Sequence, residues 1–403
     1  EYRLVQASQL RSFAMRSLAL SALALCSLLC VNALDNGLAR LPPMGWSSWN
    51  TFHRDISDSL FRDAAKAMSN NGMKDAGYRY VNIDGGWWEG SDTGKIVRNA
   101  SGHMQVNTVK FPHGIQPMID HVHELGFKYG HYTDAGVNAC NGDKPMSEGY
   151  ETQDVELFAS WRIDMIKVDA CATRQPASTL MERWRSLLNA SGRSILLSNC
   201  RNGCLNGQWQ PWCSEKANMW RTSNDIKPDW SSFLNNLDTL KGRGTFGKPG
   251  SWNDPDILEV GVGQFKWSTR DANRSRYMNQ AHFTMWCVSS SPLLAGNDVR
   301  SSPDEINSIL TNPYAIAVNQ QYAGNAGDLL TYFNHSAISP KLHGTSDVEV
   351  WMKPLLSGNL ALAVLNRHPS VPHDFTIAFQ DLPSELVGLP SGQDTSGLVC
   401  NVM

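Results

Sequence analysis

The chain has 403 residues, of which 41% are hydrophobic and 18% are charged, and its formal net charge is -3. This composition is typical of a folded protein long enough for one large domain and a smaller companion. Because neither sign of charge dominates, the sequence has no electrostatic signature of a nucleic-acid or anionic-membrane partner, and a neutral ligand fits better.

The first apolar segment predicts the compartment. Met15, Arg16 and Ser17 precede a short apolar run that ends at Val31-Asn32-Ala33, a pattern typical of a signal peptide. The run is shorter than the roughly 20 apolar residues of a membrane-spanning helix, and no other stretch approaches that length. We expect residues 1–33 to be leader and signal peptide, and the protein to be secreted or delivered to a lysosome or vacuole.

Sequons and cysteines agree with a secretory route. Asn-x-Ser/Thr sites, the acceptors of N-glycosylation, occur at Asn99, Asn189, Asn273 and Asn334. Of nine cysteines, Cys26 and Cys30 fall in the signal, so seven remain and at least one does not pair within the chain. None has the Cys-x-x-Cys spacing of a zinc or redox site, which favours disulfides.

From residue 34 to about 325, short apolar runs alternate with helical patterns, as in repeated βα units. The candidate strands span 44–49, 78–88, 127–136, 164–171, 194–200, 219–226, 251–258 and 292–298. Helices are expected between them, for example over 59–72 with Asp58 or Ser59 as N-cap, and over 179–192, ending at Gly192.

This pattern predicts a (β/α)8 TIM barrel as the catalytic domain, over 34–325. An open doubly wound sheet is the alternative, but no Gly-x-Gly-x-x-Gly follows the first strand. From 326 to 403 the sequence changes to short alternating segments, at 348–354, 359–367 and 374–379, which predict a C-terminal antiparallel β-sandwich domain. Its pattern stops midway at Met403, which indicates a truncated C-terminus.

Polar residues at the strand ends can be sorted by face, because residues two apart on a strand point the same way. The sets are Lys167 with Asp169, Asn82 with Asp84, Tyr132 with Asp134, Arg221 with Ser223 and Asp225, and Trp252 with Asp254 and Asp256. A single aspartate at a strand end is more often a helix cap, and Asp254, before Pro255, fits that role. Carboxylates on five strands instead favour an active site at the barrel mouth.

Such a mouth could bind a metal or cleave a glycosidic bond. The only His-x-His, His121 and His123, lies in a helical stretch where residues two apart diverge, and no Gly-x-Ser-x-Gly occurs. We therefore expect no metal, no cofactor and no serine nucleophile. Two carboxylates beside aromatic surfaces are what glycoside hydrolysis requires: one attacks the anomeric carbon, and the other protonates the leaving oxygen and then activates water.

The sequence resembles glycoside hydrolase family 27, the α-galactosidases and α-N-acetylgalactosaminidases, from Leu34 to about Gln321 and more weakly beyond. The resemblance is carried by Leu-Asp-Asn-Gly-Leu-Ala-Arg-x-Pro-Pro-Met-Gly-Trp at 34–46, Lys-x-Asp-x-Cys at 167–171 and Trp-Asn-Asp-Pro-Asp at 252–256. It implies a (β/α)8 barrel with a C-terminal β-sandwich, and a retaining α-galactosidase acting on terminal α-D-galactosyl residues.

The resemblance also implies roles for individual residues. Asp169 matches the nucleophile and Asp225 the general acid/base, while Cys140 and Cys171 match a disulfide. The positions that match sugar contacts are Trp46, Asp84, Tyr132, Lys167, Arg221 and Asp256. Lys167 should keep Asp169 ionised, Asp225 must hold a proton at working pH, and retention predicts carboxyl groups about 5–5.5 Å apart.

Two departures from the family pattern affect the pocket. The usual Asp-Asp after the second strand is Asp84-Gly85 here, and the usual Ser-Cys-Glu-Trp is Ser-Asn-Cys-Arg at 198–201. A site that loses a hydrogen-bonding acid discriminates less at that hydroxyl, unless a group such as Trp88 or Glu89 replaces it.

Related activities therefore stay open: α-N-acetylgalactosaminidase, β-L-arabinopyranosidase, an isomaltodextranase-like enzyme, or a carbohydrate-binding protein without catalysis. Mere binding would not need both Asp169 and Asp225. The expected partner is a carbohydrate substrate, with no nucleic acid and no membrane, and a homo-oligomer stays open.

Overall fold

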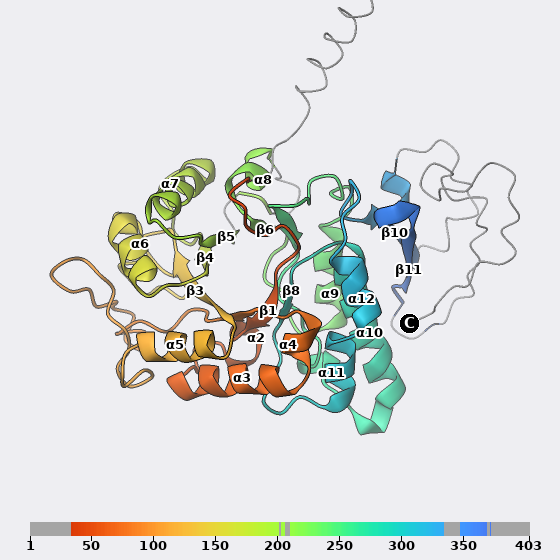
Figure 1. Ribbon diagram of the computed structural model, residues 1–403, viewed down its shortest axis with the longest axis horizontal. Coiled ribbons are helices and arrows are strands. Elements are labelled where there is room, and N and C mark those ends of the chain that lie inside the picture. Colours follow the sequence, from red (N-terminus) through yellow and green to blue (C-terminus); the bar gives the residue numbers. More distant parts are fainter. Residues whose placement is uncertain (1–33, 201–202, 206–209, 334–346, 369–370, 372–403) are drawn as a thin grey trace, which may run out of the picture. The chain divides into compact units, whose positions relative to one another are not determined.

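Eight parallel strands form one sheet, in the order β7-β6-β5-β4-β3-β2-β1-β8, in the computed structural model (Figure 1). The strands are β1 (Met44–Ser47), β2 (Tyr80–Asn82), β3 (Lys128–Asp134), β4 (Met165–Asp169), β5 (Leu196–Asn199), β6 (Met219–Arg221), β7 (Trp252–Asp254) and β8 (Leu293–Ala295). Each lies within its predicted range. The structure describes residues 34–200, 203–205, 210–333, 347–368 and 371, so the predicted signal peptide, Arg201, Asn334 and Cys400 lie outside the described residues.

The sheet closes on itself just after β7. The backbone N–H of Leu258 donates to the carbonyl of Leu294 at 2.8 Å, and its own carbonyl accepts from the N–H of Gly296 at 3.0 Å. This parallel bridge joins the segment after β7 to β8, the two ends of the strand order. The predicted (β/α)8 barrel is therefore confirmed, and the doubly wound alternative is wrong.

Helices follow the strands along the chain and lie outside the sheet (Figure 1). They are α2 (Trp49–Phe52), α3 (Asp58–Asn70), α4 (Met73–Ala76), α5 (Gln116–Glu124), α6 (Glu151–Ser160), α7 (Ala177–Ala190), α8 (Trp212–Lys216), α9 (Trp230–Asp238), α10 (Ala272–Val288), α11 (Asp304–Leu310) and α12 (Pro313–Asn319). Among the described residues, no helix has the length and apolarity needed to cross a membrane.

Two helices test the predicted boundaries. The N-cap of α3 is Ser57, not Asp58 or Ser59, because the extended Ser57 accepts the N–H of Leu60 through its hydroxyl at 3.2 Å. The other helix, α7, buries Leu180, Met181, Trp184 and Leu188, the spacing of an amphipathic helix. It ends at Ala190, and Gly192 follows with a φ of 74°, as predicted for a helix stop.

A second, antiparallel sheet follows the barrel in the order β11-β10-β9, with strands β9 (Asp328–Leu329), β10 (Val348–Pro354) and β11 (Leu360–Asn366). Strand periodicity gives it two buried faces. Val350 and Met352 pack with Leu330 and Phe333, whereas Trp351 joins the main core of the barrel. The described part of the C-terminal region is thus an antiparallel β structure, as predicted.

Candidate active site

A pocket opens where the strands of the barrel end. Seven charged or phenolic residues of its lining come from five strands or the turns after them: Asp84, Tyr132, Lys167, Asp169, Arg221, Asp225 and Asp256. Arg54, which follows α2, adds a further charge. Of the eight residues predicted to act on or contact sugar, all but Trp46 line this pocket.

Strand periodicity explains this grouping. Apolar side chains of the strands form an interior cluster: Tyr80, Met165, Leu196, Met219, Ile257 and Leu294. On β2, β4 and β6 the faces that begin with Tyr80, Met165 and Met219 carry polar groups two and four residues further on, because the side-chain period of a strand is two. Met165 is thus followed by Lys167 and Asp169, and Met219 by Arg221. The barrel therefore has an apolar floor and a polar mouth.

The buried carboxylate of Asp169 is held at the end of β4. The hydroxyl of Tyr132 donates to its Oδ2 at 3.0 Å, and the backbone N–H of Ala170 donates to its Oδ1 at 3.0 Å. Burial and then the negative charge of Asp169 raise the pKa of Tyr132 well above its usual range, so the phenol keeps its proton and acts as the donor. A carboxylate fixed through both oxygens is suited to attack in one direction.

Asp225 differs from Asp169 in exposure. Its side chain is 58% exposed, and its Oδ1 accepts from Nη2 of Arg221 at 3.2 Å. Arg221 itself is buried and also pairs with Asp256 at 2.9 Å. Burial would lower the pKa of Arg221, but Asp256 and the other carboxylates raise it instead, so the guanidinium stays charged. Asp225 can therefore reach solvent while remaining tied to the pocket.

Lys167 and Asp84 form an ion pair across the mouth, with Nζ and Oδ2 2.7 Å apart. The second oxygen of Asp84 accepts the backbone N–H of Gly85 at 2.8 Å. Burial would lower the pKa of Lys167, but the carboxylates of Asp84, Asp169 and Asp256 raise it above its usual range. The ammonium therefore stays charged between two acids of the pocket.

Asp256 has an unusual backbone, with a φ of 94° in the left-handed region that favours glycine. Its Oδ2 accepts the N–H of Ile226 at 2.8 Å, and its Oδ1 accepts the N–H of Ile257 at 2.9 Å. Burial raises the pKa of Asp256, while Arg221 and Lys167 oppose that rise. Strain of this kind persists where the surroundings fix a residue, and it clusters at functional sites.

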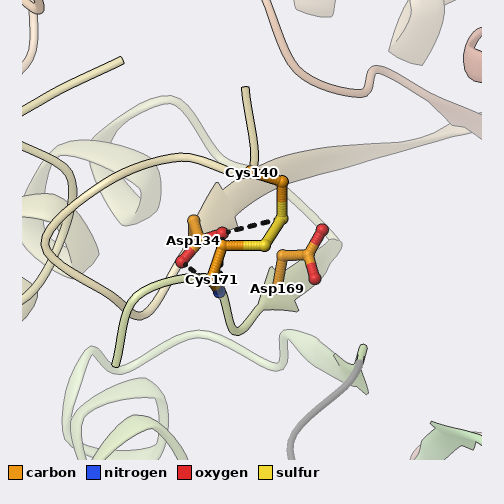
Figure 2. Close-up of side chains that lie close together, drawn as sticks. All are labelled: Asp134, Cys140, Asp169 and Cys171. Atoms are coloured by element: carbon orange, nitrogen blue, oxygen red, sulfur yellow. Dashed lines mark hydrogen bonds between the residues drawn. A yellow bond between two sulfur atoms is a disulfide. The ribbon is translucent and has the colours of Figure 1, made fainter. Parts of the chain in front are cut away.

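Two acidic residues at strand ends, Asp134 and Asp254, do not line the pocket. Oδ1 of Asp134 accepts the N–H of Cys171 at 3.0 Å (Figure 2) and that of Gly136 at 2.8 Å, so it fixes the turns after β4 and β3. The expectation that five strands bring carboxylates to one site is therefore wrong for Asp134. Asp254 accepts the N–H of Asp256 at 2.9 Å, but the next helical turn in the described chain begins only at Gly263, so the helix cap predicted for Asp254 is wrong. Burial raises the pKa of Asp254 to about 6.

The predicted disulfide between Cys140 and Cys171 is present, with its Cα atoms 5.0 Å apart, beside Asp134 and Asp169 (Figure 2). These residues gather four acidic or sulfur groups closely enough to suggest a metal site. Both sulfurs are bonded to each other, however, and so do not offer the thiolates that bind metals. A second disulfide joins Cys204 and Cys213, and neither bond includes Cys200 or Cys287.

Trp46 is not placed to contact sugar. It is fully buried, its ring packs edge-on against Phe61 of α3, and its indole N–H donates to the carbonyl of Asn297 at 2.8 Å. Trp49 lines the pocket instead, three residues later. Sequence reasoning missed Trp49 because it lies beyond β1, on α2, where strand periodicity no longer assigns a face.

The two departures from the family pattern can now be located. Gly85 lines the pocket, and Trp88 lines it beside Gly85, whereas Trp87 turns into the core and donates its N–H to the carbonyl of Tyr132 at 3.0 Å. Cys200 is buried, with its Sγ 3.5 Å from Nη1 of Arg221. Glu89 is not part of the pocket lining; its Oε2 accepts the backbone N–H of Thr108 at 3.3 Å.

A parallel-stranded barrel whose mouth carries both a buried and a solvent-reaching carboxylate meets the requirements of glycoside hydrolysis. The family profile described as alpha galactosidase A matches residues 41–321, and that of the alpha galactosidase A C-terminal beta sandwich domain matches residues 340–396. The chain therefore belongs to the α-galactosidase family, glycoside hydrolase family 27.

Individual relatives agree. An alpha-galactosidase of Cyamopsis tetragonoloba is 37% identical over 342 residues, which cover 83% of this chain and 75% of the relative. A probable alpha-galactosidase of Dictyostelium discoideum is 38% identical over 343 residues, covering 84% and 81%. The structure of an α-galactosidase from Saccharomyces cerevisiae with raffinose is 30% identical with a TM-score of 0.69, covering 83% of this chain and 76% of that one.

Proposed function

We propose that the protein is a retaining α-galactosidase that hydrolyses terminal α-D-galactosyl residues by double displacement. The observation that carries the proposal is the pairing of a buried, doubly hydrogen-bonded carboxylate, Asp169, with a solvent-reaching one, Asp225, in the same pocket. The relatives named alpha-galactosidase, and the one solved with raffinose, support galactosides as the substrate class.

The two carboxylates divide the reaction between them. Asp169 attacks the anomeric carbon and forms a covalent glycosyl ester, while Asp225 donates its proton to the leaving oxygen. Asp225 then takes a proton from water, which attacks the same carbon and releases Asp169. Two inversions give net retention. Asp84, Lys167 and Asp256 offer charged partners to sugar hydroxyls, and the rings of Trp49 and Trp88, which also line the pocket, offer apolar surface.

Substitution of the pair tests the mechanism. We expect Asp169→Ala and Asp225→Ala each to lower kcat by at least about a thousandfold with the fold intact, since each removes a group that acts in the transition state. Azide should rescue Asp169→Gly and give a product of inverted configuration. The control Asp58→Ala removes a partly buried ion pair with Arg62 on α3, away from the pocket, and should keep the rate. A near wild-type rate in Asp169→Ala would show that the nucleophile is another group.

Substrate choice needs a panel of nitrophenyl glycosides: α-galactoside, α-N-acetylgalactosaminide, β-L-arabinopyranoside and α-glucoside. We expect kcat/KM to be highest for the α-galactoside. A higher value for another member would assign that related activity, and turnover of none would favour a binding protein.

We also propose entry into the secretory pathway, for secretion or delivery to a lysosome or vacuole. Two disulfides and the exposure of the sequon residues Asn99, Asn189 and Asn273 support it, while the fourth sequon, at Asn334, lies outside the described residues. Protein made in a eukaryotic secretory host should shift in mass on treatment with an N-glycosidase; an unchanged mass would argue against this route.

A further inference from the structure

Around Gly85, at one corner of the pocket, the nearest side-chain atoms are aromatic carbons. A Cβ atom placed on Gly85 would lie 3.4 Å from Cη2 of Trp88, 3.5 Å from Cε1 of Tyr132 and 3.9 Å from Cζ3 of Trp49. These are ordinary van der Waals contacts, and the three rings also line the pocket. A group of the bound sugar that reaches this corner therefore meets ring carbons.

The polar atoms of two of these rings are turned to other partners. The indole N–H of Trp88 donates to Oδ2 of Asp143 at 2.8 Å, so the far edge of its six-membered ring faces Gly85. The hydroxyl of Tyr132 donates to Asp169. The rings of Trp88 and Tyr132 are stacked, with centroids 6.3 Å apart and planes 25° apart, which fixes the wall of the corner.

Asp143 holds this arrangement from the loop after β3. Its side chain is buried, and the oxygen that accepts from Trp88 also accepts from Nη2 of Arg54 at 2.9 Å. Arg54 follows α2 and packs over Gly86, where a Cβ atom would lie 3.1 Å from Cβ of Arg54. One buried carboxylate therefore ties together the segments that follow β1, β2 and β3, and it sets the direction of the Trp88 indole.

We propose that Trp88 is a specificity-determining residue, positioned by Asp143, and that the corner it forms at Gly85 accepts a C–H or methyl group of the sugar in preference to a hydroxyl. The inference rests on the proposed function and narrows its substrate class to galactose-configured glycosides that lack a hydroxyl at one position. A hydroxyl pressed against ring carbon loses its water partner without gaining another, whereas a C–H or methyl group gains contact with the ring.

Four monodeoxy nitrophenyl α-galactosides, lacking the hydroxyl at carbon 2, 3, 4 or 6, test the corner. In the wild-type enzyme one analogue should match or exceed the parent galactoside in kcat/KM. The other three should fall at least about tenfold, because each loses a hydrogen bond to a charged group of the pocket. Equal losses for all four analogues would overturn the proposal.

Variants assign the preference to Trp88 and its partner. Asp143→Ala removes the acceptor of the Trp88 indole N–H, and Trp88→Phe removes the indole that donates it. Each variant should therefore abolish the preference for the favoured deoxy analogue. Asp143→Asn keeps an oxygen that can accept the Trp88 indole N–H, so this variant should retain the preference for the deoxy analogue. Gly85→Asp places an acid in the corner and should favour the parent by roughly tenfold. The control Asp120→Asn alters an exposed pair with Arg162 and should change nothing.

A general loss of activity with an unchanged order of substrates in Asp143→Ala and Trp88→Phe would reduce Asp143 to a structural role and overturn the proposal. Calorimetric titration with galactose and the four free deoxy sugars keeps the two hypotheses apart. If no glycoside is cleaved, the proposed activity fails. The titrations then test the corner by themselves. The corner proposal holds if one deoxy sugar binds the wild type as tightly as galactose does and binds Trp88→Phe more weakly than galactose does.

Discussion

Glu259 contacts the pocket residue Asn50 and has no ion-pair partner in the part of the chain that the structure describes. It is 1% exposed, its Oε1 accepts from Nδ2 of the pocket residue Asn50 at 2.8 Å, and its Oε2 has no hydrogen-bond partner among the described residues. Burial, followed by the charge of Asp256, raises the pKa of Glu259 from 4.5 to about 9. The side chain is therefore protonated at neutral pH in the folded protein.

This raised pKa gives a stability prediction with a definite sign. Between pH 4.5 and 9 the folded state binds a proton at Glu259 that the unfolded chain has released, so wild-type stability falls as pH rises through that window. Glu259→Gln removes the titration. We expect it to gain stability relative to wild type by on the order of 3 kcal/mol between pH 5 and pH 8.

Urea unfolding of both proteins at pH 5, 6.5 and 8 measures the effect. The gap between Glu259→Gln and wild type should widen steadily with pH. Parallel stability curves would show that Glu259 ionises near its ordinary pKa in the folded protein.

At the scale of elements, the loop after β3 is attached to β4 by the Cys140–Cys171 disulfide, whose cysteines are 31 residues apart. Cys140 lines the pocket, and Cys171 follows the proposed nucleophile by two residues. The same loop carries Asp143. The cross-link therefore connects the turn that holds Asp169 to the loop that holds Trp88.

Replacing both Cys140 and Cys171 by Ser should lower the free energy of unfolding by about 3–4 kcal/mol, because the unfolded chain regains the entropy of the closed loop. The Cys204–Cys213 bridge spans 9 residues and serves as a matched comparison. Its removal should cost about 1 kcal/mol less by the same relation. Denaturant titration of the two double variants gives the values, and the prediction fails if the shorter bridge proves the more stabilising. Peptide mapping without reductant must first find Cys140 and Cys171 bonded in protein made in a secretory host.

At the scale of the whole described fold, charged side chains join the antiparallel sheet to the barrel. Arg367, just after β11, pairs with Asp238 of α9 at 2.7 Å and with Glu349 of β10 at 2.9 Å. Lys353 of β10 is fully buried, and its ammonium donates to the carbonyls of Val318 and Asn319 at the end of α12. Burial lowers the pKa of Lys353 from 10.5 to about 7.

Lys353→Met tests the contact that Lys353 makes between the antiparallel sheet and helix α12 of the barrel. The folded pKa lies below the unfolded one, so the unfolded chain binds the extra proton between pH 7 and 10.5, and wild-type stability rises across that range. Met leaves two carbonyls without their donor, which should cost about 1–3 kcal/mol at pH 9. The loss of stability in Lys353→Met should be smaller at pH 6, because Lys353 is then protonated in the wild type and carries a buried charge. Thermal unfolding at both pH values gives the comparison; the exposed Lys66→Met is the control, and equal losses at both pH values would contradict the argument.

The fold and most of the site could be predicted because both follow from local periodicity. Alternating apolar runs and helical patterns placed all eight strands, and the period of two placed Lys167 with Asp169 and Arg221 with Asp225 before any contact was known. The same rule failed at Asp134, the last residue of β3. Its carboxylate accepts the N–H groups of Gly136 and Cys171 in the adjoining turns and does not line the pocket.

The sequence by itself determined the barrel, its polar mouth and the family. The inward face of a strand follows from every second residue, and the family motifs are short runs of neighbouring residues, so both can be identified locally. The tertiary structure alone decided that Trp49 rather than Trp46 lines the pocket and that Asp143 holds Trp88. Each of these depends on how loops of different strands meet. No local period encodes such meetings, because they are set by burial and by hydrogen bonds between residues far apart in the chain.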